Sequence, residues 1–474
     1  MTGTADRPGA DRILRYADPA GPAGVAPRFA EAGAPPAEPR DEPAAAFPQL
    51  PGGLNPLIGP ANAEPEPRED AWQVRVQAPA GADGAPVIVY IPGGGFMTGA
   101  GTVRWFDSPD LVERAGCVLV TVNYRIGALG HFGPDGSDAV HDSQRPLRDL
   151  LAALRWVRER IADFGGDPEQ VTLAGDSAGA WYAFALSTMP EAAGLFRRTL
   201  LVSFPREAPL DVEALAARRA VFDEALAAQG ADGIADAPVE AVLAAQAALA
   251  PAFAGRGMPL MPAAGGPVPA GLHDFERSAG ALHVESIALL STSEEAAAFL
   301  LRAPEQAFAD PQVDGFIGAR FARPDAVREH LAAKLPGASA KRRMVEALTL
   351  HQFRLCHLEL AAAAARHGVD AHLASFSVPS GLPDAGSPHC LPLPFLFGER
   401  SAWHDAPMLE GIDDATFART SSALQEWAVG FARDGAPGFE GRALAPSRPE
   451  SPERLELAAD GARLERPDEL PLLG

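Results

Sequence analysis

The chain is short of several residue types, and each shortage limits what it can do. Its 474 residues include only two lysines, Lys334 and Lys341, and Lys and Arg together number 40 against 62 Asp and Glu, a formal net charge of −22. Binding to nucleic acid or to an anionic membrane needs clustered Lys and Arg, so neither is expected as the main partner. A small, neutral molecule fits this charge better, and the composition leaves the oligomeric state open.

Cysteines and long apolar runs are also scarce. The three cysteines, Cys117, Cys356 and Cys390, are too few and too far apart for a disulfide framework or a zinc site, so we expect buried free thiols. Nothing in the sequence supports a cofactor or a metal site. The first residues lack the apolar segment of a signal peptide, and no apolar run of about 18 residues is free of charge, Gly and Pro. We therefore expect a cytoplasmic protein.

The remaining composition is that of a globular protein, and the pattern along the chain is that of an α/β fold. Apolar residues make up 47% of the chain, enough for a sizeable core. A segment rich in Pro, Ala and Gly, from about residue 17 to 67, lacks periodicity and predicts a loop. Beyond it, short apolar runs alternate with amphipathic stretches, as in strands joined by helical crossovers. The predicted strands are 85–91, 117–124, 170–175, 199–204, 285–291 and 372–378.

Stretches whose apolar residues recur at helical spacing lie between several of these strands. Leu147, Leu150, Leu154 and Val157 recur at that spacing and predict an amphipathic helix packed on the sheet. Two Ala-rich stretches, about 206–265 and 323–367, are helical in pattern and are expected to be excursions between core strands. No stretch between the strands has the composition of a flexible linker. We therefore expect one α/β domain over residues 1–474, although the length would allow two or three.

The sharpest local signal is a GxSxG pattern between an apolar strand and a helix. In VTLAGDSAGAWYAFAL, Ser177 stands between Gly175 and Gly179, where a tight strand-to-helix turn would expose its hydroxyl above the sheet. A Cβ at either glycine would collide as strand and helix approach each other. The alternative without catalysis is a Gly-rich turn in which the serine caps the helix. The strand-turn-helix context favours a nucleophile, with the start of the helix aimed at a nearby oxyanion.

A glycine run follows an earlier strand. The segment Pro92-Gly93-Gly94-Gly95-Phe96 stands where an α/β-hydrolase places backbone amides opposite its nucleophile. An ordinary turn or a phosphate-binding loop are the alternatives. The phosphate loop is discounted because no GKS or GKT and no nearby lysine accompany the glycines.

Beyond these patterns, the sequence resembles the type B carboxylesterase family, which includes bacterial para-nitrobenzyl esterases and the cholinesterases. The match covers most of residues 15–440, and FGGDPEQVTLAGDSAG is its most specific part. The further matching segments are RYADPAGPAGVAPRF, PVIVYIPGGGF, VTVNYRIGALG, LFRRTLLVS, STSEEAAAF and SPHCLPLPFLFG. The resemblance implies an α/β-hydrolase fold, with a central, mostly parallel sheet flanked by helices and carrying helical insertions. It also implies hydrolysis of carboxylic esters through an acyl-enzyme on Ser177.

The resemblance also supplies the partners of Ser177, which spacing alone does not identify. The family's acid falls on Glu295 and its histidine on His389, in the order nucleophile, acid, histidine. Its oxyanion-hole amides fall on Gly94, Gly95 and Ala178. Ser203 matches a serine that supports the triad from behind, although a serine capping the strand end is a comparable interpretation. Asp176 replaces the usual Glu before the nucleophile, and we expect it to be ion-paired near the triad.

Several positions depart from the family. Pro92, Ala296 and Pro392 replace a His, a Gly and an acid, and Ala71 stands where secreted members have a loop cysteine. Pro92 has no amide to donate, but the donors that matter belong to the following glycines, so catalysis should survive. About 14 residues precede the match at Arg15, so the sheet is expected to lack the family's opening hairpin.

The candidate substrate pocket is inferred from apolar residues near the glycine run and the nucleophile. Phe96, Met97, Trp105, Phe106 and Trp181 are candidates for a pocket that binds a neutral, moderately apolar ester, with plain core packing as the alternative. An acyltransferase, a lactonase or a thioesterase would use the same triad. A non-catalytic binding protein is a further alternative, disfavoured by the presence of the complete set of residues.

Overall fold

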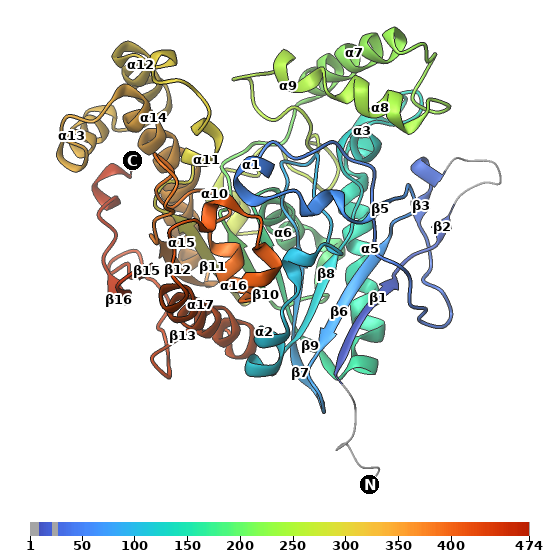
Figure 1. The fold of residues 1–474 in the computed structure, drawn as a ribbon, viewed down its shortest axis with the longest axis horizontal. Coiled ribbons are helices and arrows are strands. Elements are labelled where there is room, and N and C mark those ends of the chain that lie inside the picture. Colours follow the sequence, from blue (N-terminus) through green and yellow to red (C-terminus); the bar gives the residue numbers. More distant parts are fainter. Residues whose placement is uncertain (1–8, 21–26, 474) are drawn as a thin grey trace.

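The computed structural model describes residues 9–20 and 27–473, and its central element is a ten-stranded sheet (Figure 1). The strands of the sheet, in spatial order, are β1 (Ala10–Arg15), β6 (Gln73–Ala78), β8 (Val118–Val122), β7 (Ala85–Ile91), β9 (Gly166–Asp176), β10 (Arg198–Val202), β11 (Ser286–Thr292), β12 (Asp370–Phe376), β15 (Arg454–Ala458) and β16 (Gly461–Glu465). From β8 to β15 every neighbouring pair is parallel, whereas β1, β6 and β16 pair antiparallel. The predicted mostly parallel sheet is confirmed.

The six predicted strands all form, and the strands that sequence reasoning missed lie toward the edges of the sheet. They are β1, β6, β15 and β16. The two at the edges, β1 and β16, keep only part of their surface buried, and their sequences, ADRILR and GARLE, mix charged and apolar residues. Near the start of the chain, the described residues hold one strand of this sheet, β1. Residues 1–8 lie outside the described part, so the expected loss of an opening hairpin stays a prediction.

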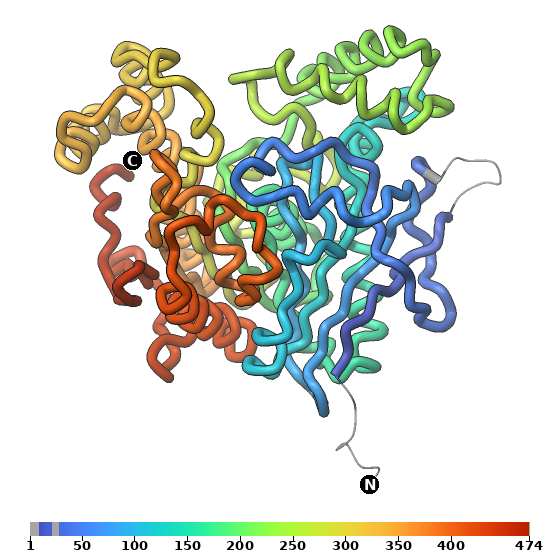
Figure 2. Tube along the Cα trace, viewed as in Figure 1, coloured from blue at the N-terminus to red at the C-terminus, as the bar shows by residue number. Residues whose placement is uncertain are grey.

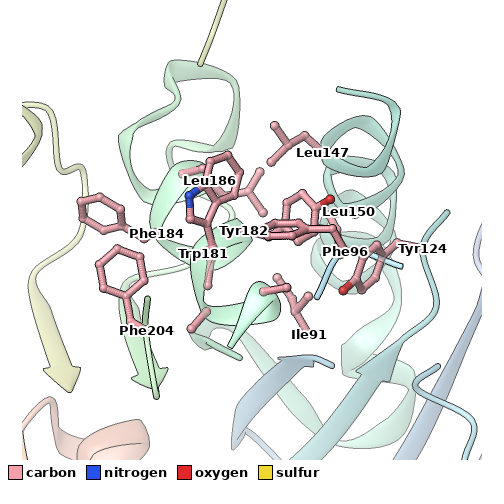
Figure 3. Close-up of a cluster of buried hydrophobic side chains, with 14 of the residues drawn as sticks. Ile91, Phe96, Tyr124, Leu147, Leu150, Trp181, Tyr182, Phe184, Leu186 and Phe204 are labelled. Atoms are coloured by element: carbon pink, nitrogen blue, oxygen red, sulfur yellow. The ribbon is translucent and has the colours of Figure 1, made fainter. Parts of the chain in front are cut away.

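Alternate residues of each central strand enter two different cores. In β7, Val87 and Val89 pack into one hydrophobic cluster, whereas Ile88 and Tyr90 pack into the other. The first face is covered by α5 (Arg145–Arg160), α6 (Ala178–Thr188) and α15 (Leu355–Arg366), and the second by α2 (Pro109–Ala115), α16 (Pro392–Phe397) and α17 (Asp414–Asp434). The predicted amphipathic helix is α5. Its apolar residues, Leu147 and Leu150 among them, lie in the first cluster (Figure 3).

The two predicted helical excursions are present. Between β10 and β11 the chain forms α7 (Val212–Ala228), α8 (Val239–Gln246), α9 (Leu249–Ala252) and α10 (Phe275–Ala279). Between β11 and β12 it forms α11 (Ala297–Leu300), α12 (Asp310–Arg320), α13 (Pro324–Lys334), α14 (Ala340–Thr349) and, through a π-helical turn at 350–354, α15. In Figure 1, α7–α9 and α12–α14 form two separate groups beyond one end of the sheet.

The Pro-, Ala- and Gly-rich N-terminal segment is mostly irregular where it is described, as predicted, and its part at 21–26 lies outside the described residues. Its short elements are β2 (Pro19–Ala20), β3 (Glu31–Ala32), β4 (Ala45–Ala46), β5 (Glu66–Pro67) and α1 (Asn55–Ile58). The remaining elements of the chain are α3 (Gly127–His131), α4 (Ala139–Ser143), β13 (Gly438–Phe439) and β14 (Arg442–Ala443). The N-terminal and C-terminal regions lie at opposite edges of the molecule (Figure 2). Within 9–20 and 27–473, no helix is both long and apolar enough to cross a membrane.

Candidate active site

Ser177 occupies a strained turn between β9 and α6. Its φ of 53° and ψ of −120° place it in a conformation that L residues rarely adopt. The turn is held by the Ser177 amide, which donates to the Val202 carbonyl of the neighbouring strand at 2.9 Å. The side chain of Ser177 lines a cavity, together with His389. The structure therefore places the predicted nucleophile at the carboxyl edge of the sheet with its side chain accessible.

The glycines on either side of this turn are required by close backbone contacts. A Cβ on Gly175 would lie 2.5 Å from the carbonyl carbon of Gly179. A Cβ on Gly179 would meet the Ile91 carbonyl oxygen and would lie 3.0 Å from the carbonyl carbon of Pro92, where the glycine run begins. The predicted collision between strand and helix is confirmed for Gly175, whereas Gly179 is required by the end of the neighbouring strand β7. Gly179 also allows α6 to lie directly against the start of the glycine run.

The glycine run forms a tight loop opposite Ser177. Gly94 and Gly95 have φ of 134° and 60°, and a Cβ on Gly94 would collide with the Thr98 carbonyl oxygen. The Pro92 carbonyl accepts a hydrogen bond from the Tyr124 hydroxyl at 2.6 Å. Among the described residues, the amides of Gly94, Gly95 and Ala178 have no hydrogen-bond acceptor. All three residues line the cavity beside Ser177, so three amides without an acceptor belong to its wall.

Glu295 and His389 come together over 94 positions of sequence. His389 Nδ1 lies 2.5 Å from Glu295 Oε2, and both side chains are almost completely buried. The other carboxylate oxygen, Oε1, accepts hydrogen bonds from the Ser203 hydroxyl at 2.7 Å and from the Thr292 amide at 2.8 Å. His389 Nε2 is buried and has no hydrogen-bond partner within the described ranges, and no bond joins it to the Ser177 hydroxyl. The site thus holds an imidazole with one nitrogen anchored and the other free.

The comparisons with known proteins agree with this geometry. The family model of the carboxylesterase family matches residues 16–227. A probable N-octanoylanthranilate hydrolase from Rhodococcus erythropolis is 30% identical over 83% of this chain and 82% of that protein. The chain belongs to the carboxylesterase family. This carboxylesterase is accordingly a carboxylic ester hydrolase.

Further relatives and solved structures resemble this carboxylesterase, most of them over nearly its whole length and one over a shorter stretch. Phenmedipham hydrolase from Pseudarthrobacter oxydans is 29% identical over 90% of this chain and 85% of its own. Para-nitrobenzyl esterase from Bacillus subtilis is 40% identical over 29% of each chain. A solved PNB esterase structure superposes with a TM-score of 0.75 at 25% identity, covering 96% of this chain and 93% of that one. A thermophilic PNB esterase, with a TM-score of 0.79 at 24% identity over 96% and 95% of the chains, shares the fold.

Asp176 has different partners from those expected. We predicted an ion pair, but its carboxylate accepts hydrogen bonds from the Tyr90 hydroxyl at 2.8 Å and from the Gly93 amide at 2.9 Å, with no ion pair among the described residues. The shorter side chain keeps the carboxylate close to the backbone of the glycine run. Burial raises the pKa of Asp176 above its ordinary value. In this carboxylesterase, Asp176 therefore braces the start of the glycine run against the nucleophile turn.

The cavity beside Ser177 has a volume of about 620 Å³ and a mainly apolar lining. Four of the five predicted pocket residues, Phe96, Met97, Trp105 and Phe106, line it. Trp181 does not. Its ring is fully buried and packs edge-on against Phe96 at 5.6 Å, in the cluster shown in Figure 3. The prediction for Trp181 is corrected, because α6 directs this side chain into the core behind the lining.

Two phenylalanines that sequence reasoning missed flank the imidazole. The rings of Phe299 and Phe353 lie 5.1 Å and 5.4 Å from the His389 ring, and both line the cavity. Phe353 belongs to the π-helical turn, and Phe299 lies on the short helix α11 and is 53% exposed. Neither position carries a sequence signal of its own, because both belong to insertions whose path is set by tertiary packing.

The electrostatic setting of His389 differs from that of a free histidine. Burial disfavours the imidazolium, but the neighbouring Cys390 and the Glu295 carboxylate favour it and raise the pKa of His389 well above its ordinary value. Burial also raises the pKa of the Cys390 thiol, which is therefore uncharged near neutral pH. An uncharged thiol does not attract the imidazolium by its charge. We therefore attribute the raised pKa of His389 to the Glu295 carboxylate.

The cysteine thiols and the side-chain types that ligate metals are the last features that bear on the chemistry of the chain. Cys117, Cys356 and Cys390 are all buried and free, as predicted. Within 9–20 and 27–473, no group of three or more His, Cys, Asp or Glu side chains is arranged to hold a metal ion.

Proposed function

We propose that Ser177, His389 and Glu295 are the catalytic triad of this ester hydrolase, and that the amides of Gly94, Gly95 and Ala178 form its oxyanion hole. The observation that carries the proposal is the Glu295–His389 hydrogen bond beside a strained Ser177, in one cavity with three free amides. A carboxylate on Nδ1 selects the tautomer whose Nε2 accepts a proton. Such a group, next to an accessible hydroxyl, is what acyl transfer to serine requires.

Each residue has one role in the proposed cycle. Ser177 Oγ attacks the ester carbonyl carbon while His389 Nε2 takes the hydroxyl proton, and the carbonyl oxygen becomes an anion held by the three amides. The C–O bond to the alcohol then breaks, and His389 returns the proton to the leaving oxygen. Water attacks the resulting acyl-enzyme by the same route and releases the acid. Glu295 stabilises the imidazolium in both halves, and Ser203 and Thr292 hold Glu295 in place.

The bond between Ser177 and His389 is expected to form when substrate closes the site. Hydrogen bonds of this kind are often long in unliganded enzymes and shorten in the substrate complex. Phe299 and Phe353 support this proposal, because their rings pack against the His389 ring at 5.1 Å and 5.4 Å and limit its movement. Asp176 is proposed as a positioning residue, since its hydrogen bond to Gly93 orients the amides that follow.

The proposed substrate is a moderately apolar carboxylic ester of small or medium size. Phe96, Met97, Trp105 and Phe106 line the cavity, whose volume suits a small ligand. A cytoplasmic location is proposed as well, because three buried cysteines remain free thiols. Fractionation of cells that express the natural chain would test the location.

Labelling with a fluorophosphonate probe tests the triad directly. The natural protein should be labelled at Ser177 and should hydrolyse short- and medium-chain nitrophenyl and aryl esters. Ser177→Ala should lose both. The matched control is Ser422→Ala, at an exposed position on α17, which should keep both. Labelling or ester hydrolysis that survives in Ser177→Ala would overturn the proposal.

A further inference from the structure

Glu207 places a carboxylate in the lining of an otherwise mainly apolar cavity. It lies in the loop after β10 and lines the same space as Ser177. The side chain is half-buried, and its carboxylate makes no hydrogen bond or ion pair within the described part of the chain. A carboxylate in apolar surroundings is costly unless a partner compensates it. No described residue supplies that partner through a hydrogen bond or an ion pair, and only the charge of Arg320 acts on the carboxylate without direct contact.

The loop that carries Glu207 is held firmly in place. Trp181 Nε1 donates a hydrogen bond to the Glu207 carbonyl at 2.7 Å. The Arg206 amide donates to the Gln352 carbonyl at 2.8 Å, and its guanidinium pairs with Glu359 at 2.8 Å. His273 contacts the Pro205 carbonyl at 3.2 Å. Because the backbone is held on several sides, the Glu207 side chain starts from a fixed point in the cavity lining.

A second unpaired acceptor lies close by. Gln352, whose backbone contacts the Glu207 loop, also lines the cavity, and its side-chain oxygen is buried with no hydrogen-bond partner in the described ranges. A carboxylate and an amide oxygen without donors make a site that accepts hydrogen bonds. A primary ammonium has three donors and a positive charge, so it satisfies both groups together.

We propose that Glu207 and Gln352 form a subsite for a primary ammonium group carried by the ester substrate away from its reacting carbonyl. Ser177, Glu207 and Gln352 line the same cavity, so one substrate can meet the nucleophile and the subsite together. An ester with several methylenes between its carbonyl and its amine is the class that the subsite would take. The net charge of −22 also favours the approach of a cation. The subsite rests on the proposed function, and it amends the expectation of a wholly neutral substrate.

The charged and titratable groups around Glu207 leave it available near neutral pH. Burial raises the pKa of Glu207 to about 7, against the opposing charge of Arg320 from α12. Burial lowers the pKa of His351 and of His273 to about 4, so both are uncharged. Arg206 is paired with Glu359, and Arg302 lines the cavity at an exposed position. A bound ammonium would lower the pKa of Glu207 and keep it ionised.

Matched esters test the subsite. Phenyl 6-aminohexanoate and phenyl heptanoate differ only in a terminal ammonium or methyl on the acyl side, and 5-aminopentyl benzoate and hexyl benzoate differ likewise on the alcohol side. The natural enzyme should prefer the amine in one of the two pairs by kcat/KM. Glu207→Gln should reduce that preference by about tenfold or more, equivalent to 1.4 kcal/mol. The control is Glu213→Gln, which removes an exposed charge from α7 and should leave the preference unchanged.

Two further measurements keep the test independent of how the variant folds. In the natural enzyme, the amine preference should grow from pH 6 to pH 8 as Glu207 ionises, because His389 acts on both esters of a pair and cancels in the ratio. Hexylamine should inhibit more strongly than 1-hexanol, by a margin that grows over the same range. No amine preference in either pair, an equal preference in Glu207→Gln, or a preference for the phenyl monoester of heptanedioic acid would overturn the subsite. Ser177-dependent hydrolysis of the alkyl esters would leave the proposed function intact in each case.

Discussion

Glu295 Oε2 and His389 Nδ1 lie 2.5 Å apart, in surroundings from which water is almost entirely excluded. A hydrogen bond between an ionised acid and an imidazole is stronger in such surroundings than in water. The Ser203 hydroxyl and the Thr292 amide hold the carboxylate in place by donating to its other oxygen. The basicity of His389 therefore depends on groups that never touch substrate.

The pH dependence of hydrolysis should reflect the raised pKa of His389. His389 must be uncharged to accept a proton, so kcat/KM should fall as pH decreases through the pKa of this residue. Because that pKa is raised, the acid limb should lie above the ordinary histidine value of about 6.5. Steady-state rates of a neutral ester between pH 5 and pH 9 measure it.

A variant without the charge of Glu295 is the control for the pH dependence of kcat/KM. Glu295→Gln keeps the shape of the side chain but withdraws the carboxylate that stabilises the imidazolium. The acid limb should move to lower pH and kcat should fall by about 1,000-fold or more. An acid limb at the same pH in both proteins would show that His389 is not the base.

Ser203→Ala should weaken the support of Glu295. Glu295 would lose a 2.7 Å hydrogen bond and keep only the Thr292 amide on that oxygen. Hydrogen bonds to charged groups contribute about 1.5–3 kcal/mol, so kcat/KM should fall by about 10- to 100-fold. With fewer donors the carboxylate attracts the imidazolium more strongly, and the acid limb should move to higher pH. Ser377→Ala, which removes a 2.7 Å bond to Glu456, is the control, and an equal loss there would reject a positioning role.

Gly179→Ala should damage both stability and activity. The added Cβ would collide with the Ile91 carbonyl oxygen and press on Pro92 at the start of the glycine run. We expect a loss of about 3 kcal/mol in the free energy of unfolding, measured by urea denaturation. Gly315→Ala in α12 is the control, since a Cβ there meets no atom within 4 Å. That variant should be stabilised by roughly 0.5–1 kcal/mol, and equal destabilisation of both would contradict the steric argument.

Glu469→Gln should weaken the contact between the C-terminal segment and Arg354, which lies in the second helical excursion. Glu469 is completely buried between Arg354 and Arg454, and its carboxylate lies 3.0 Å from Arg454 Nη1. Burial opposes ionisation, but the two arginines outweigh it and lower the pKa of Glu469. Removing one charge of a buried cluster costs about 3–5 kcal/mol in unfolding free energy.

The sign of the accompanying pH effect follows from the lowered pKa. Stability from Glu469 is present above the carboxyl pKa of the unfolded chain and is lost as pH falls toward the folded value. The difference in unfolding free energy between natural protein and Glu469→Gln should therefore shrink below about pH 4. Glu285→Gln, which breaks an exposed pair with Arg197, should cost less than about 1 kcal/mol at neutral pH. Comparable losses in the two variants would argue against the buried cluster.

The sequence by itself determined the central strands and the nucleophile turn. Both depend on short stretches of chain: a buried parallel strand is a continuous apolar run, and a strand-to-helix turn needs Gly175 and Gly179 wherever it occurs. Resemblance to a family then supplied Glu295, His389 and the amides of the oxyanion hole. The two edge strands, β1 and β16, escaped prediction because their part-exposed residues mix charged and apolar types.

Only the tertiary structure decided what surrounds the triad. Glu295 and His389 are 94 residues apart, and their bond exists because β11 and β12 are neighbours in the sheet. Asp176 accepts hydrogen bonds from Tyr90 and Gly93 in place of the expected ion pair, and the Trp181 side chain lies in the core. Glu207 was one of 62 acidic residues until the fold placed it in the cavity. Such outcomes depend on which elements pack together, because a side chain's partners come from distant parts of the chain, whereas a strand or a turn is specified by its own residues.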